Sequence, residues 1–212
     1  PVTSWALIDS AGRPKPAWFA TRRALAPVAC ALRRAADDAA GRRGPWSAWA
    51  VSILRETLPV RAVWQRHALD GSVLATHTQD LTLAANGGTD LTVPPDWAAL
   101  APEVIELATL SLHPGGPSDT LGAPLARAHA WPEPFRWHRF PDPVIDLRAA
   151  RDGALLLRAQ RPAKGVWIHA PHASLDDNFL DLMPGETVRI GCAGVLDGMS
   201  AICLNNVQDA VP

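Results

Sequence analysis

Residues 58–84 read LPVRAVWQRHALDGSVLATHTQDLTLA, and they indicate the fold class. Apolar side chains alternate at Leu58, Val60, Ala62 and Trp64. A period of two is typical of a strand that has one face in a core, so Trp64 is expected to point inward. Two strands are predicted in this stretch, over 58–68 and 72–84.

Short apolar runs continue on both sides of this stretch, punctuated by twenty Pro and fifteen Gly. Short strands separated by turn residues are typical of an all-β sandwich. Turns are predicted at Asn86-Gly87-Gly88 and at residues 113–117. The remaining strand candidates span 46–56, 104–112, 125–131, 154–160, 165–170, 187–193 and 200–207.

The segment 1–27 differs from the rest of the chain. Pro14 and Pro16 favour the start of a helix over 14–26, which Pro27 ends, and Trp18 and Leu25 are placed on one face of it. Residues 4–8 predict a short strand that ends in a turn. One strand and one helix resemble the tail of an α/β unit. The Pro-rich connection up to residue 143 places a domain boundary near 141.

Composition excludes several classes of protein. The net charge is −1 and the pI about 6.8, so a nucleic-acid binder with a basic face is not expected. The Arg doublets at 22–23, 33–34 and 42–43 are interpreted as solvated faces and loops. No run of 18 apolar residues occurs, so no membrane span is expected.

Nine Trp and no Tyr make the aromatic content unusual. Trp faces can stack on sugar rings, although packing in a core or between domains is the favoured interpretation for each Trp. Sugar binding is therefore expected to be absent or weaker than a dissociation constant of about 100 µM. The candidates for a carbohydrate platform are Trp46, Trp49, Trp64, Trp131 and Trp137.

Metal and nucleophile motifs are weak. His169 and His172, followed by Asp176 and Asp177, have zinc-like spacing, but an extended strand would place them on opposite faces. Residues 176–178 with Asp181 resemble a calcium loop that lacks its glycine, and a turn is the favoured interpretation. No G-x-S-x-G elbow and no phosphate-binding glycine loop is present. We therefore predict no catalytic, metal or cofactor-binding residue.

The carboxylates give no catalytic pair either. None of the five Glu occurs in a context that pairs it with a second carboxylate across a cleft, as glycoside hydrolysis requires. These residues are Glu56, Glu103, Glu106, Glu133 and Glu186.

Asp197-Gly198 is a strong two-residue turn signal between the apolar runs 187–193 and 200–207. Pairing about this turn places Cys192 opposite Cys203 as a hydrogen-bonded pair, with Cα atoms about 5.5 Å apart. That spacing disfavours a disulfide, so we predict two reduced, largely buried thiols, with Cys30 unpaired as well. Three thiols argue weakly against an oxidising compartment, and the location otherwise stays open.

Two motifs resemble the β-mannosidases of glycoside hydrolase family 2. The opening PVTSWALIDSAGRPKPAWFATRRALAPV is similar to the last barrel strand and helix of that family, and KGVWIHAPHASLDDNFLDLMPGETVRI, residues 164–190, is similar to its final domain. The matching positions are Pro1, Ser4, Trp5, Asp9, Gly12, Arg13, Lys15, Arg22, Ala26, Pro27 and Val28 in the first motif, and Asp177, Asn178, Phe179, Asp181, Leu182, Pro184, Gly185 and Glu186 in the second.

The resemblance implies a mainly β chain: residues 1–27 as the last strand and helix of a (β/α)8 barrel, 28–141 as an immunoglobulin-like β-sandwich, and 142–212 as a smaller one. It implies a retaining, exo-acting parent enzyme that removes terminal β-linked mannose with two upstream glutamates. The chain, which begins with Pro1, would be a non-catalytic fragment that buttresses the barrel, its partner. The apolar segment 1–27 would then be an exposed appendage. The alternatives are a free-standing carbohydrate-binding module and a structural or interaction domain.

Overall fold

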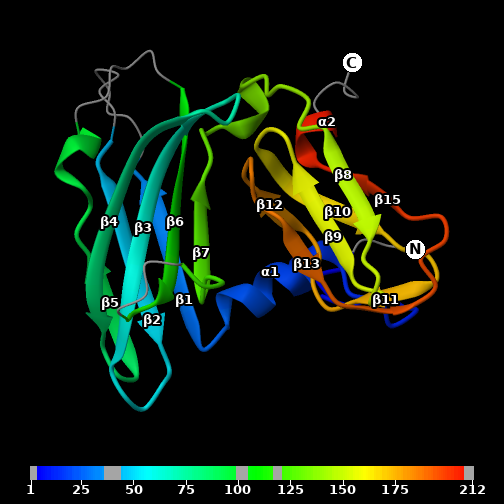
Figure 1. Cartoon of the computed structure of the whole chain (residues 1–212), viewed down its shortest axis with the longest axis horizontal. Coiled ribbons are helices and arrows are strands. Elements are labelled where there is room, and N and C mark those ends of the chain that lie inside the picture. The colour runs from blue at the N-terminus through cyan, green and yellow to red at the C-terminus, as the bar shows by residue number, and fades with distance from the viewer. Residues whose placement is uncertain (1–3, 36–43, 99–104, 117–120, 208–212) are drawn as a thin grey trace. The chain divides into compact units, whose positions relative to one another are not determined.

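The computed structural model describes residues 4–35, 44–98, 105–116 and 121–207 (Figure 1). Contacts divide the chain into two compact units. The middle unit comprises residues 23–135, and the terminal unit joins residues 1–22 to residues 136–212. Both consist mainly of antiparallel strands, as the sequence predicted. No helix among the described residues is long and apolar enough to cross a membrane.

The middle unit contains two antiparallel sheets, one of three strands and one of four. The first has the order β1-β2-β5 and the second β4-β3-β6-β7, and a 3-10 turn, η1, follows β5. The bounds are β1 Val28–Arg34, β2 Trp46–Ser52, β3 Leu58–Ala68, β4 Val73–Leu83, β5 Gly87–Leu91, η1 Pro95–Ala98, β6 Glu106–Pro114 and β7 Ala126–Ala130.

The alternation in β3 sets the core of the middle unit. Val60, Ala62 and Trp64 are at most 1% exposed, which confirms the inward face predicted for Trp64. Trp97 packs edge-to-face on Trp64, with ring centroids 5.6 Å apart. Leu110 of the neighbouring strand β6 lies directly opposite Trp64 and is also fully buried. The core therefore lies on the face of β3 that the period of two indicated.

A buried ion pair lies at the far end of the same two strands. The Nε of Arg66 on β3 donates to Oε2 of Glu106 on β6 at 2.8 Å, and the side chains are 8% and 1% exposed. A charge removed from water in this way is tolerated only while its partner is present. Glu106 is thus held as the counter-ion of Arg66.

Glu106→Ala is expected to lower the free energy of unfolding by about 3–5 kcal/mol, because it leaves the Arg66 charge buried without its carboxylate. Urea denaturation followed by fluorescence measures this loss. The double variant Arg66→Met/Glu106→Leu serves as the control, since it removes both charges and should recover most of the loss. A single variant as stable as the wild type would contradict the assignment.

Among its described residues, the terminal unit contains two α-helices, a 3-10 turn and three small sheets with the orders β13-β9-β8, β12-β10-β15 and β11-β14. Leu155, Leu157, Val166, Ile168 and Leu182 form the centre of its core. The bounds are α1 Pro16–Ala24, η2 Phe135–Trp137, β8 Ile145–Ala149, β9 Leu155–Ala159, β10 Ala163–His169, β11 Ala173–Leu175, β12 Leu180–Leu182, β13 Val188–Ile190, β14 Cys192–Gly194, β15 Ser200–Ile202 and α2 Leu204–Val207.

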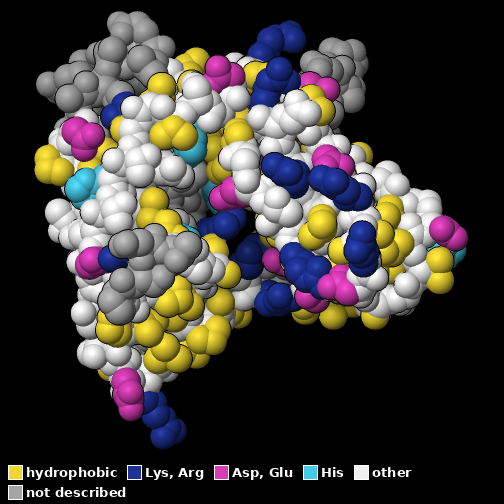
Figure 2. Space-filling model, viewed as in Figure 1, with side chains coloured by type: hydrophobic (Ala, Val, Ile, Leu, Met, Phe, Trp, Pro, Cys, Tyr) yellow, Lys and Arg dark blue, Asp and Glu magenta, His cyan; other side chains and the backbone are white. Residues whose placement is uncertain are grey.

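The terminal unit carries charges of both signs on the face that Figure 2 shows. On the face seen in Figure 2, its Lys and Arg side chains lie beside Asp and Glu side chains. The unit includes the ion pairs Arg148–Asp146, at 2.9 Å, and Arg189–Asp152. The second pair holds the pKa of the Asp152 carboxyl below its ordinary value, chiefly through the hydrogen bond from Arg189.

The segment 1–27 corrects two expectations. The strand expected over residues 4–8 is not formed: Ile8 and Pro14 make an isolated bridge, because the turn after Ile8 folds the chain back on itself. The expectation that residues 1–27 form an exposed apolar appendage is also only partly correct. Trp5 and Leu25 are exposed, but Phe19 of α1 is only 3% exposed and Trp18 is half-buried, so the helix is packed on one side.

The predicted hairpin about Asp197-Gly198 is wrong. Cys192 on β14 lies opposite Leu175 of β11, and β15 pairs with β10 instead. Cys192 is therefore on β14 and Cys203 directly follows β15, and these two strands are not neighbours. None of the three cysteines forms a disulfide, although the register argument used to predict this does not apply.

Cys30 lies between the two sheets of the middle unit, with its Sγ 4.0 Å from the carbonyl oxygen of Leu110. Burial raises the pKa of the Cys30 thiol to about 12. Because the thiolate is the reactive form, this thiol should react very slowly at pH 8.

We expect a thiol-specific disulfide reagent at pH 8 to modify the half-buried Cys192 at least tenfold faster than Cys30. Peptide mapping by mass spectrometry at successive times separates the three sites. A Cys192→Ser variant is the control and should lose the early phase of modification. Modification of Cys30 in the early phase would contradict the burial.

Candidate functional site

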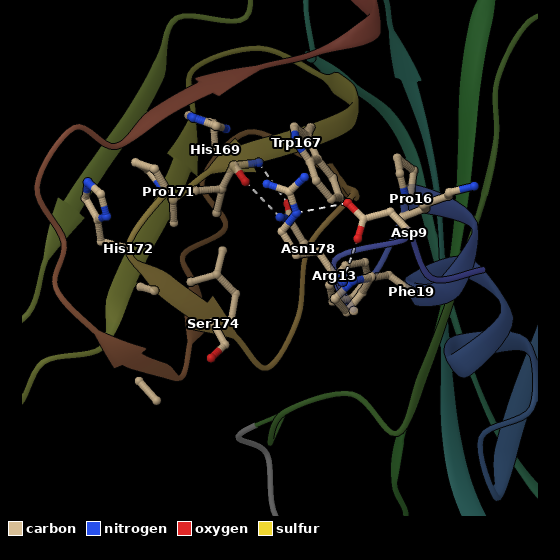
Figure 3. Close-up of a pocket in the computed structure, with 18 residues that line it drawn as sticks. Asp9, Arg13, Pro16, Phe19, Trp167, His169, Pro171, His172, Ser174 and Asn178 are labelled. Carbon is tan, nitrogen blue, oxygen red and sulfur yellow. Dashed lines mark hydrogen bonds and ion pairs between the residues drawn. The ribbon is translucent and has the colours of Figure 1, made fainter. Parts of the chain in front are cut away.

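The terminal unit contains a cavity of about 820 Å³, which we call the α1–β10 pocket (Figure 3). One side consists of residues 9–16 and Phe19, at the start of α1. The other consists of residues 167–175, the end of β10 with the turn into β11. In Figure 3, Asp9 and Pro16 lie near Trp167, whereas His169, Pro171 and His172 lie along the other side.

Trp167 is the aromatic wall of the pocket. On β10 its neighbours Val166 and Ile168 are buried in the core, so the strand places the Trp167 side chain on the opposite face, where it is half-buried. Phe19 packs against it edge-to-face, with ring centroids 6.0 Å apart. The pocket therefore combines an aromatic residue from β10 with one from α1, at the opposite end of the sequence.

A turn built around Asp9 forms the rim beside α1. Its Oδ1 accepts the backbone N–H groups of Ala11 and Arg13 at 2.8 and 2.9 Å, and its Oδ2 accepts Nε of Arg13 at 2.9 Å. The backbone hydrogen bond from Arg13, more than the guanidinium, holds the pKa of Asp9 below its ordinary value of 3.8. Asp9 thus organises the turn that orients Arg13 at the pocket.

Because the folded-state pKa of Asp9 is lowered, the carboxylate stabilises this turn at neutral pH, and that contribution is lost as the pH falls through the lowered pKa. We expect an NMR titration of the Asp9 carboxyl to have its midpoint below 3.8. Arg13→Ala should raise the midpoint only part of the way, because the backbone N–H donors remain. A midpoint at or above 3.8 would contradict the geometry.

Side chains of the motif at residues 177–186 hydrogen-bond the backbone of β10. The Asn178 side chain is buried: its Oδ1 accepts N–H of Ile168 at 2.8 Å, and its Nδ2 donates to the carbonyl of Ile168 at 2.9 Å. Asp181 accepts N–H of Gly165 at 2.8 Å, and the Phe179 ring lies where a Cβ on Gly165 would be. These residues hold β10 in place, and with it Trp167.

The two candidate metal sites are not assembled. His169 and His172 are exposed on the pocket side, and Asp176 Oδ1 accepts N–H of Gly191 at 2.8 Å. Asn178 and Asp181 bind backbone groups of β10 instead of converging. In the described ranges, no group of three or more His, Cys, Asp or Glu could hold a metal ion.

The five Trp proposed as a carbohydrate platform are not brought together. Trp64 and Trp131 are buried, and Trp46 packs on Trp97 beneath the guanidinium of Arg34. Trp49 and Trp137 are 40% and 70% exposed. Trp167 was missed, although its position between Val166 and Ile168 in the sequence already indicated the outer face of a strand.

Three of the five Glu residues have structural partners in the described part of the chain. Glu106 pairs with Arg66, Glu133 accepts N–H of Phe135 at 3.2 Å, and Glu186 accepts N–H of Met183 at 3.3 Å. Glu56 is exposed, and Glu103 lies outside the described residues. That the chain holds no catalytic residue stays a prediction.

Comparison with known proteins agrees with the two motifs. Residues 140–201 match the family model of the mannosidase Ig-fold domain. The chain is 31% identical to β-mannosidase B of Thermothelomyces thermophilus over 216 aligned residues and 28% identical to that of Emericella nidulans over 211, each covering 92% of this chain. The chain spans 24% of the length of these relatives.

Solved structures share the fold. A β-D-mannosidase from Dictyoglomus thermophilum superposes with a TM-score of 0.70 at 17% identity, covering 97% of this chain and 25% of that one. An exo-chitosanase from Amycolatopsis orientalis gives a TM-score of 0.57 at 18% identity, covering 94% of this chain and 29% of that one. The resemblance predicted from the sequence is confirmed: the chain is a relative of the glycoside hydrolase family 2 β-mannosidases.

Proposed function

We propose that this chain is a non-catalytic part of a retaining, exo-acting β-mannosidase that removes terminal β-linked mannose, and that it buttresses the catalytic barrel. The relationship to the β-mannosidases B over 92% of the chain supports the parent activity. Retaining hydrolysis needs two carboxyl groups about 5–5.5 Å apart. Glu106, Glu133 and Glu186 are engaged with an arginine or with backbone groups, which agrees with a supporting role.

The docking of α1 is the observation that carries the buttressing role. We assign residues 1–27 to the end of the barrel, 28–141 to one sandwich and 142–212 to a second. On this assignment, α1 is the barrel helix that packs on the second sandwich, through Phe19 against Trp167. A guanidinium N–H of Arg22 also donates to the carbonyl of Asp176. The packing and the hydrogen bond would fix the barrel to the sandwich.

A hybrid enzyme tests this proposal. The matching segment of the Thermothelomyces thermophilus β-mannosidase B is replaced by this chain, and turnover of a chromogenic β-mannoside is measured. The chain alone should give no turnover, whereas the hybrid should be active. Phe19→Ala in the hybrid should shorten the half-life of thermal inactivation several-fold, because truncating a buried aromatic costs about 3–5 kcal/mol.

The matched control is Leu25→Ala, since Leu25 lies just after α1 and is 76% exposed. It should leave the half-life unchanged. Turnover by the chain alone would overturn the non-catalytic role. Equal half-lives for the two variants would overturn the buttressing role.

A further inference from the structure

We propose that the α1–β10 pocket is a low-affinity binding site for a neutral saccharide, with Trp167 as the surface on which a sugar ring stacks. The choice of a manno-oligosaccharide as the ligand rests on the proposed function; the site itself rests on the geometry of the pocket. At about 820 Å³ the cavity falls in the usual range of small-molecule sites, about 300–1,000 Å³.

The aromatic wall supplies the apolar part of such a site. The packing of Phe19 against Trp167 is edge-to-face, and the Trp167 side chain is only half-buried. A half-buried Trp ring that lines a pocket can offer its apolar surface to the C–H face of a sugar. Trp167 lies on β10, and the backbone of the next residue, Ile168, makes two hydrogen bonds with the Asn178 side chain, which fix the position of the strand.

The rim supplies both donors and acceptors, which sugar hydroxyls require. Arg13 uses Nε on Asp9, and its four terminal N–H donors have no hydrogen-bond partner among the described residues. His169, His172 and Ser174 line the other side, and none of these three side chains has a hydrogen-bond partner in the described part of the chain. Two polar edges thus flank the aromatic wall.

The charged side chains of the pocket are few and largely offset one another. The Asp9 carboxylate lies against the Arg13 guanidinium at 2.9 Å, so that these two charges offset each other. Lys15 is directed by its Nζ to the carbonyl of Ser4, at 3.3 Å. Asp9, Arg13 and Lys15 together therefore give the pocket a single net positive charge, which lies at Lys15 beside the carbonyl of Ser4.

The affinity should be in the millimolar range. The rim side chains are exposed to water, so each hydrogen bond to a sugar replaces one to water with little net gain. A single aromatic wall supplies most of the binding. This agrees with the sequence-based expectation of a dissociation constant above about 100 µM.

An NMR titration of the full chain with β-1,4-mannobiose tests the inference. The amide and indole signals of the pocket should shift with a dissociation constant between about 0.1 and 10 mM. Trp167→Ala should weaken binding at least tenfold. His172→Ala and Arg13→Ala remove exposed side chains, so both should leave the fold intact and weaken binding about two- to fivefold. Trp49→Ala is the matched control, an exposed Trp in the middle unit, and should change nothing.

Absence of shifts at about 50 mM sugar, or equal affinity in the His172→Ala, Arg13→Ala and wild-type chains, would overturn the inference. The hybrid enzyme separates this failure from failure of the proposed function. An active hybrid whose chain shows no saturable binding refutes the pocket alone. Saturable binding in a chain that gives an inactive hybrid refutes the buttressing role alone.

Discussion

The terminal unit depends on the hydrogen bonds that the backbone of one strand, β10, makes beyond the point where its partner strand β12 ends. On one edge, β10 pairs with β12 only as far as Val166. Beyond that point the Asn178 amide takes the place of a strand, giving Ile168 both an acceptor and a donor. A buried, unpaired peptide group is costly, so this one side chain allows β10 to continue to His169.

The continuation of β10 has three effects. It gives β15 a partner on the other edge, it places Ile168 in the core, and it holds Trp167 outward against Phe19. The motif that links the chain to the β-mannosidases is therefore a structural motif. Asn178 and Asp181 act on the backbone of β10, and the chemistry of the surface is left to residues outside the motif.

Local periodicity predicted much of the fold. The alternation around Trp64 identified β3 and its buried face, and the Pro residues located α1 to within a few positions. Strands were missed where the composition pointed elsewhere. β1 ends in an Arg doublet that was interpreted as a solvated face, and β5 begins with the glycines that were interpreted as a turn. The prediction of a hairpin about Asp197-Gly198 was wrong because a strong local turn signal does not decide which strand lies beside β15.

The pocket could not be predicted in the same way, because its two walls are brought together only by tertiary packing. The sequence offered five other Trp residues as candidates for a carbohydrate platform, and Trp167 was not among them. The structure instead joins one outward Trp on β10 to an aromatic residue of a helix at the other end of the sequence. That Phe19 rather than Trp18 is buried depends on what lies beside α1, which helical periodicity does not reveal.

The lack of a side chain at Gly191 affects the attachment of helix α1, through Asp176. A Cβ at this position would fall on the Asp176 carboxylate, which accepts the Gly191 N–H. The backbone N–H of Asp176 in turn donates to the Gly191 carbonyl, and its own carbonyl receives Arg22 of α1. A substitution at 191 would thus displace Asp176 and loosen a helix that residue 191 is not observed to contact. Glycine is therefore required at position 191 because of the attachment of α1, and not because of the conformation of its own backbone.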